Sequence, residues 1–231
     1  MTYPADEVEE KLVDVPELFL FLRRAVPDAT VVTHDRAFIN NIAFALQYLD
    51  HLLQTIAAPD VRITIHSQTC KSIVMCGMGI VEAILWFGVK KAGQANTSSW
   101  QESSKQTGTP FDRFGKRLRI DSILMEEVSP PQHEEMTLDT LIKKVESRGL
   151  LGLSDHRVYG TLKALRQLRN RVHIHDVGTA DDTDWYKFTG REVVMLLNCL
   201  NAIFSTNLFN PEPHHIDLLS FLDPVRVERK R

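Results

Sequence analysis

The segment from Ser67 to Ala92 constrains the fold most, because apolar side chains occupy nearly every face of the helix that it predicts. A helix that is hydrophobic all round is buried, so this segment belongs at the centre of the fold. No uninterrupted apolar run reaches the roughly 18 residues that a membrane helix needs, and we therefore expect no membrane contact. The defining apolar positions are Ile73, Val74, Ile80, Val81, Ile84, Leu85 and Phe87.

Amphipathic patterns predict further helices that cover this central segment, and capping residues mark their ends. Before the segment we expect a short helix that stops ahead of Pro27 and a long helix that runs from a Thr33 cap to Pro59. After it we expect a helix ended by Gly149, a helix capped by Ser154 and a last helix from a Thr189 cap through Leu208.

The stretch from Gln94 to Pro131 interrupts the helical pattern. It begins with a polar tract, and "RLRIDSILMEEV" (residues 117–128) is typical of a strand that could pair with residues 100–105 as a small hairpin. We expect Pro130 and Pro131 to close this insertion. The sequence therefore predicts an all-α (mainly α) bundle with a polar or small β-hairpin insertion.

Composition sets limits on function. The chain has 231 residues, 43% of them hydrophobic and 25% charged, as in ordinary globular proteins. Its formal net charge of −3 gives no general affinity for phosphate, so any contact with nucleic acid must rest on a local basic patch. Four acidic residues between positions 6 and 10 break any signal peptide, and three cysteines without zinc spacing indicate reduced thiols that pack. We expect a cytoplasmic protein.

The most unusual motif is "LRQLRNRVHIHD", residues 165–176. On an ideal helix Arg166, Arg169 and His173 lie within about 80° of one another, beside a buried apolar stripe. His175 would lie on the far side, but Asp176 and Gly178 indicate that the helix is ending, so the direction of His175 stays open. The stripe consists of Val158, Leu162, Leu165, Leu168 and Val172.

This motif, which precedes a final amphipathic helix, resembles the HEPN superfamily (higher eukaryotes and prokaryotes nucleotide-binding domains). That family carries an Arg, commonly followed by a polar residue, and then a His after four to six intervening positions. Arg169 with Asn170 and His175 fits with five between, and Arg166 with His173 fits with six. The resemblance covers roughly residues 70–209 and includes "GIVEAILW" (79–86) as the family's early helix. It divides the chain into an N-terminal helical extension (1–65), a HEPN-like domain (66–210) and a C-terminal tail (211–231).

The resemblance implies metal-independent RNA cleavage, with no cofactor, at a site that two protomers build together. Histidine, with a pKa near 6.5, can accept or donate the protons, and arginine's planar fork suits the charge of the phosphorane. We expect Arg169 and either His173 or His175 to be catalytic, with Asn170 supporting them. The further expected residues are Arg166 and Arg171 for RNA binding and Glu82, whose carboxylate needs a partner, as an arginine's support. The expected partners are RNA, with tRNA as one candidate, a second copy of the chain and an antitoxin or other defence-system protein.

Other interpretations stand beside this one. The chain can be a non-catalytic module that binds a protein or nucleotide, or His173, His175 and Asp176 can be metal ligands. An Arg-rich helix end is also typical of a solvated surface. We expect His214 and His215 to lie in a surface loop and "RVERKR" (226–231) to be a frayed terminus.

Overall fold

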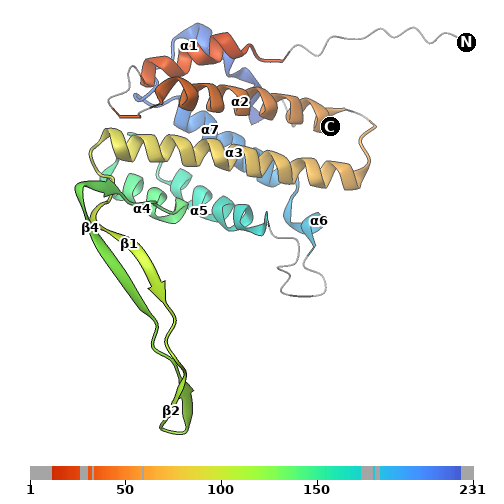
Figure 1. The fold of residues 1–231 in the computed structure, drawn as a ribbon. Helices are drawn as coiled ribbons and strands as arrows, with labels where there is room; N and C mark the ends of the chain where they lie inside the picture. The colour runs from red at the N-terminus through yellow and green to blue at the C-terminus, as the bar shows by residue number, and fades with distance from the viewer. Residues whose placement is uncertain are drawn as a thin grey trace, which may run out of the picture.

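The computed structural model describes residues 12–26, 31–32, 34–58, 60–153, 155–172, 179 and 183–224. Its body is a bundle of helices around α3 (Ile63–Lys91), as Figure 1 shows. Helix α2 (Asp35–Ala57) contacts α3 on one side, with α1 (Val15–Ala25) beyond it, and α4 (Leu138–Arg148) and α5 (Arg157–Arg169) contact α3 on the other side. Helix α7 (Gly190–Phe204) also packs on α3.

Helix α3 is central because nearly half of its residues are buried, on several faces. It is long and apolar enough to span a membrane by length and composition, with a mean hydropathy of 1.9 over its best 18-residue window. This test differs from the search for an uninterrupted apolar run, because its window tolerates charged residues, so the expectation of no membrane contact stays a prediction. Because 61% of that window is buried inside the protein, core packing accounts for its apolar character.

A single apolar core extends from Leu18 in α1 to Leu222 in the 3-10 turn η2 (Ser220–Leu222). Helix α3 approaches α7 closely at Gly77, where any Cβ would collide with the side chain of Leu196. The body is thus one packed unit that includes both the first helix and the C-terminal segment. The short helices α6 (Asp184–Lys187) and α8 (Pro213–Leu218) complete the described chain.

Two of the predicted helix ends are confirmed by the geometry. Thr189 caps α7 through a capping box with Glu192, which satisfies two otherwise unpaired amide groups. Gly149 ends α4 in the left-handed conformation, with φ of 59°, that glycine adopts at little cost. The predicted caps Thr33 and Ser154 lie outside the described residues, and α7 ends at Phe204 rather than Leu208.

The all-α prediction is wrong, because residues 97–133 form an extended antiparallel ribbon instead of a small hairpin. Strand β1 (Thr97–Gln106) pairs with β4 (Ser122–His133), and β2 (Phe111–Arg113) pairs with β3 (Lys116–Leu118) at the distal end. The ribbon projects away from the helices, as Figure 1 shows. The ribbon buries no apolar face of its own, so its strands need no alternation of apolar and polar residues. The sequence therefore carries no signal from which its length could be predicted.

The details of the ribbon confirm one part of the sequence prediction and correct another. The predicted pairing of residues 100–105 with the second strand is confirmed, as Trp100 faces Glu127 and Lys105 faces Ile123. The predicted strand 117–128 is divided between β3 and β4, and Pro130 lies within β4 because a two-stranded ribbon leaves one edge of each strand unpaired. At the base, the amide of Glu134 donates to the carbonyl of Asn96 (2.9 Å), so the two ends of the insertion meet.

The C-terminal segment also differs from the sequence prediction. His214 and His215 lie in α8 rather than in a loop, and the His215 side chain is only 6% exposed. Its ring packs against Phe21 with centroids 5.0 Å apart. The surface interpretation holds for His214 alone, because the aromatic side of His215 fills space beside α1.

Candidate functional site

Helix α5 carries the arginine motif, and its apolar stripe fixes which way the arginines face. Leu162 and Leu165 are buried in the core, and Arg166 and Arg169 flank them on a half-buried strip. The α-helix ends at Arg169, where the 3-10 turn η1 (Asn170–Val172) begins, and Arg171 has non-helical dihedral angles (φ −78°, ψ 28°). The rotation of 100° per residue that favoured His173 over His175 therefore does not hold through residues 170–172.

His173 and His175 both lie outside the described residues. Their assignment as alternative proton-transfer residues stays a prediction. The described part of the motif is residues 165–172, which end directly before His173. The helical strip that favoured His173 is interrupted at Arg171, so it no longer separates the two histidines.

Arg169 is held by an ion pair with a distant residue of α3. One terminal nitrogen of its guanidinium lies 2.7 Å from a carboxylate oxygen of Glu82. The predicted pairing of Glu82 with an arginine of the motif is confirmed, although Glu82 is half-buried rather than fully buried. Because the guanidinium has five N–H donors, this contact orients Arg169 and leaves other donors for a ligand.

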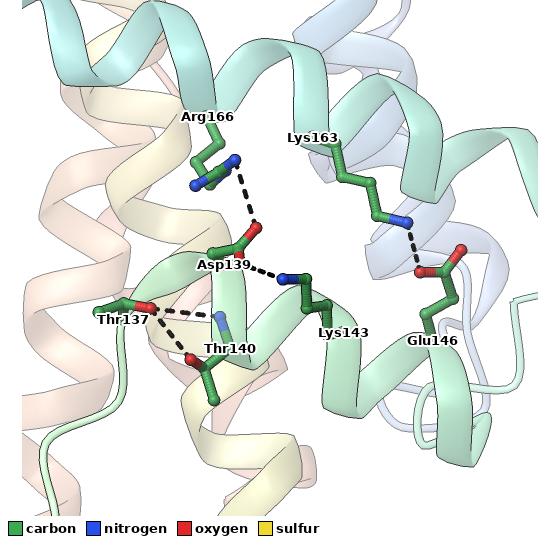
Figure 2. A network of polar contacts seen from close by, with 7 residues as sticks. All are labelled: Thr137, Asp139, Thr140, Lys143, Glu146, Lys163 and Arg166. Atoms are coloured by element: carbon green, nitrogen blue, oxygen red, sulfur yellow. Dashed lines mark hydrogen bonds and ion pairs between the residues drawn. The ribbon is translucent and has the colours of Figure 1, made fainter.

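Arg166 is held in the same way by α4. Its guanidinium lies 3.3 Å from the Asp139 carboxylate, which also forms an ion pair with Lys143 (2.6 Å), as Figure 2 shows. The hydrogen bond from Lys143 and the charge of Arg166 lower the pKa of Asp139, so this carboxylate stays ionised at neutral pH. Thr137 caps the helix at this point by accepting from the amide of Thr140.

These residues surround an open cavity of about 660 Å³ at the junction of α3, α4 and α5. Buried Met136 and Leu138 contribute apolar lining, and the charged lining includes both carboxylates and guanidinium groups. The ribbon reaches this cavity, because Glu135 lies two residues beyond the end of β4. The lining residues are Glu82, Glu135, Met136, Thr137, Leu138, Asp139, Arg166, Arg169 and Asn170.

The structure thus brings together four of the predicted site residues: Glu82, Arg166, Arg169 and Asn170. Arg171 does not line the cavity and sits half-buried at the non-helical turn. Sequence reasoning missed two acidic contributors, Glu135 and Asp139, and the cap Thr137. Asp139 follows the helix cap Thr137, and an acidic residue is typical of the first turn of a helix, where it interacts with the helix dipole. The sequence pattern therefore did not indicate that Asp139 would line a cavity.

A second polar cluster lies near the C-terminal end of the described chain, in α8 and the residue before it. Glu212, His214 and His215 place one ligand atom each within 4.8 Å of one another, a grouping that a metal ion can use. Arg24 already occupies this place, 2.6 Å from Glu212 and 3.4 Å from Nδ1 of His215. Since Nδ1 also accepts the amide of Glu212 (3.0 Å), the cluster has the character of a structural contact between α1 and α8.

The buried thiols are unsuited to nucleophilic chemistry. Burial raises the pKa of Cys76 to about 11 and that of Cys199 to about 12, so both remain protonated at neutral pH. The predicted packing of Cys76 is confirmed, since it lies against the core, and Cys199 is part of the core as well. The arginine cavity is therefore the better candidate for chemistry.

No protein-family model matches the sequence, and no curated protein or solved structure matches the chain. The resemblance to the HEPN superfamily consequently rests on the residues quoted for it. Any function has to be argued from the cavity and the motif themselves.

Proposed function

We propose that the cavity between α3, α4 and α5 cleaves RNA without a metal ion, with Arg169 binding the phosphate at which the strand is cut. The observation that supports this most is the placement of Arg169 and Asn170. Both motif residues line an open cavity, and Glu82 fixes the guanidinium there. The pair with Glu82 holds this guanidinium at the cavity rather than in open solvent, where a ligand phosphate can reach its remaining donors.

The reaction that suits these residues is an internal transfer. The ribose 2′-oxygen forms a bond to the adjacent phosphorus, the bond from phosphorus to the 5′-oxygen breaks, and a 2′,3′-cyclic phosphate and a 5′-hydroxyl result. One group takes the proton of the 2′-hydroxyl and another supplies a proton to the leaving oxygen, roles that His173 or His175 can fill. Arg169 neutralises the additional charge of the phosphorane.

A second copy of the chain would complete this site. One motif offers few groups for two proton transfers and charge stabilisation, and pairing about a two-fold axis doubles them. A toxin or defence effector of this kind would be held in check by an antitoxin or another defence-system protein. These partners belong to the proposal and not to the geometry.

The test is cleavage of tRNA and of total RNA by the purified protein in EDTA. Replacing Arg169 with Ala should reduce the rate by about 10²- to 10³-fold, the usual effect of losing one transition-state donor. Arg169→Lys should not rescue, because a point charge does not replace the planar fork. His173→Ala or His175→Ala should cost about 10²- to 10⁴-fold, and the larger loss identifies the acid or base.

Arg157→Ala is the matched control, since the Arg157 side chain is 91% exposed at the start of the same helix. It should leave the rate unchanged. Cleavage that requires an added divalent metal would support the histidines as metal ligands instead. RNA binding without cleavage would support the non-catalytic module, and full activity of Arg169→Ala would overturn the proposal.

A further inference from the structure

The distal end of the ribbon is basic, although the chain as a whole is acidic. We define the ribbon tip as residues 111–121, which carry four cationic side chains and two carboxylates, against a net charge of −3 for the whole protein. Arg119 is paired with Asp121 (2.9 Å), so the other three cations carry the excess positive charge. The strands nearer the body have the opposite balance, with Lys105 against Glu102, Glu126 and Glu127. Positive charge is therefore concentrated at the point farthest along the insertion.

The register of β2 and β3 sorts the tip into two unlike faces. Residues that are directly opposite in an antiparallel pair point to the same side. Phe111 with Leu118 and Arg113 with Lys116 therefore share one face, while Asp112 and Arg117 compensate each other on the other. Like charges directly opposite each other are unfavourable, so the pair of cations on the first face is a ready position for an anion.

The apex of the tip presents an aromatic ring to solvent. Phe114 and Gly115 both have positive φ (55° and 70°), the conformation of a tight hairpin turn in which Asn-Gly is the favoured pair. Phe114 is 85% exposed, so its ring contributes no burial in return for this unfavourable backbone. The Arg113 guanidinium lies over that ring, 4.9 Å from its centroid. Folding of the ribbon does not account for a phenylalanine here.

We propose that the ribbon tip binds RNA, with Arg113 and Lys116 contacting phosphates and the exposed ring of Phe114 stacking on a base. Cations beside an exposed aromatic ring are the combination that holds single-stranded nucleic acid. The inference deepens the proposed function, on which the choice of RNA rests. It also supplies what the cavity lacks, because Glu82, Glu135 and Asp139 outnumber the two arginines that line it.

The geometry of the ribbon sets the length of RNA that can use both sites. Strand β4 has 12 residues and extends over roughly 40 Å at about 3.3 Å per residue. Its base adjoins the cavity through Glu135, and its other end leads to the tip. An RNA strand stacked as in a duplex, with a phosphate about every 3.4 Å along its axis, needs on the order of ten nucleotides to span this distance. A stacked RNA shorter than this should reach one of the two sites only.

The test is binding of a fluorescent 20-nucleotide 2′-O-methyl RNA, which cannot be cleaved by 2′-oxygen attack, followed by anisotropy across a salt titration. The double variant Arg113→Gln with Lys116→Gln should bind more weakly, and its slope of log K against log salt should be shallower by about 1.4, or 0.7 for each lost phosphate contact. The matched control is Arg148→Gln with Arg157→Gln, two exposed arginines of the body. It should keep the slope of the unaltered protein.

Phe114→Asn separates RNA binding from folding. Asparagine is favoured at this turn position, so the variant should keep or raise the melting temperature. The loss of stacking should weaken RNA binding by about 5- to 100-fold. Equal affinity of Phe114→Asn and the unaltered protein, or equal salt slopes of the tip variant and its control, would overturn the proposal. So would binding to phosphatidylserine vesicles, or self-association, that needs Phe114 while RNA binding does not.

Failure of this proposal is distinguishable from failure of RNA cleavage in the cavity. Arg169→Ala should lose only its own phosphate contact, about 0.7 of the salt slope, and adding Arg113→Gln and Lys116→Gln to this variant should still make the slope shallower by about a further 1.4. Loss of binding in the tip variants together with unchanged cleavage in Arg169→Ala would retain the tip and reject the catalytic cavity. The reverse pattern would reject the tip alone.

Discussion

The helical body and the β-ribbon are neighbouring stretches of one chain, but their apolar side chains lie in opposite environments. The body buries a single apolar core from Leu18 to Leu222, whereas within the strands of the ribbon only Ser98, Ser99 and Val128 are even half-buried. Large apolar side chains of the ribbon, such as Phe114 and Leu124, face solvent instead. Residue type therefore means different things in the two regions. In the body an apolar residue stabilises the fold, and in the ribbon it is available for contact with something else.

The sharpest test of this contrast removes one phenylalanine ring from each region. Phe21 is fully buried and packs against the rings of Phe204 and Phe209, so Phe21→Ala should lower the free energy of unfolding by about 3–5 kcal/mol. The same change at exposed Phe114 should stay within about 0.5 kcal/mol. Urea denaturation of both variants measures the difference, and similar losses would show that the ribbon packs on the body in solution.

A smaller effect is expected from two glycines of α3 that differ only in what surrounds them. Gly77→Ala places a methyl group against Leu196 of α7, and overpacking of this kind costs about 1–3 kcal/mol. Gly79→Ala meets nothing within 4 Å, so it should stabilise the helix by about 0.5–1 kcal/mol. Thermal melts that rank these two variants the other way would contradict the close contact between α3 and α7.

The smallest effect concerns pH and again belongs to the body. Burial, with the charges of His214 and Arg24, lowers the pKa of His215. The unfolded chain therefore binds a proton below about pH 6.5 that the folded chain resists, so stability is complete above this pH and falls as the pH decreases. We expect the urea midpoint to decrease between pH 7.5 and 5.5, and to decrease less in His215→Gln.

This pH window lies above the range in which carboxylates titrate, so the ion pairs of Asp139 and Glu212 stay charged throughout. His214→Gln is the matched control, because His214 is exposed. It should retain most of the pH dependence. An identical response of His215→Gln and the unaltered protein would show that burial of the ring does not disfavour its protonation.

Sequence patterns anticipated the elements whose signals are local. The Thr189 cap, the Gly149 stop and the apolar character of α3 were recognisable because caps and periodicity are written in consecutive residues. The pairing of Glu82 with an arginine of the motif was also predicted, and the arginine is Arg169, 87 positions later in the chain. A carboxylate inside an apolar run needs a partner, and the motif offered one.

The remainder depended on three-dimensional proximity. Asp139 and Glu135 join the cavity only because α4 follows the ribbon and packs on α3 and α5. The burial of His215 depends on a contact with α1, almost 200 residues earlier in the chain. The length of the ribbon was missed for another reason. Strand prediction relies on one buried face, and this ribbon has none.

The hydrogen bond between Asn96 and Glu134 has a consequence for how this protein can change over evolutionary time. The chain leaves the helices and returns to them at almost the same point, so the loop between is closed whatever its length. Doubling such a loop costs only about 0.6 kcal/mol in closure entropy. The insertion can therefore grow, shrink or be exchanged without disturbing the helices, so the ribbon can diversify while the helical scaffold is inherited unchanged.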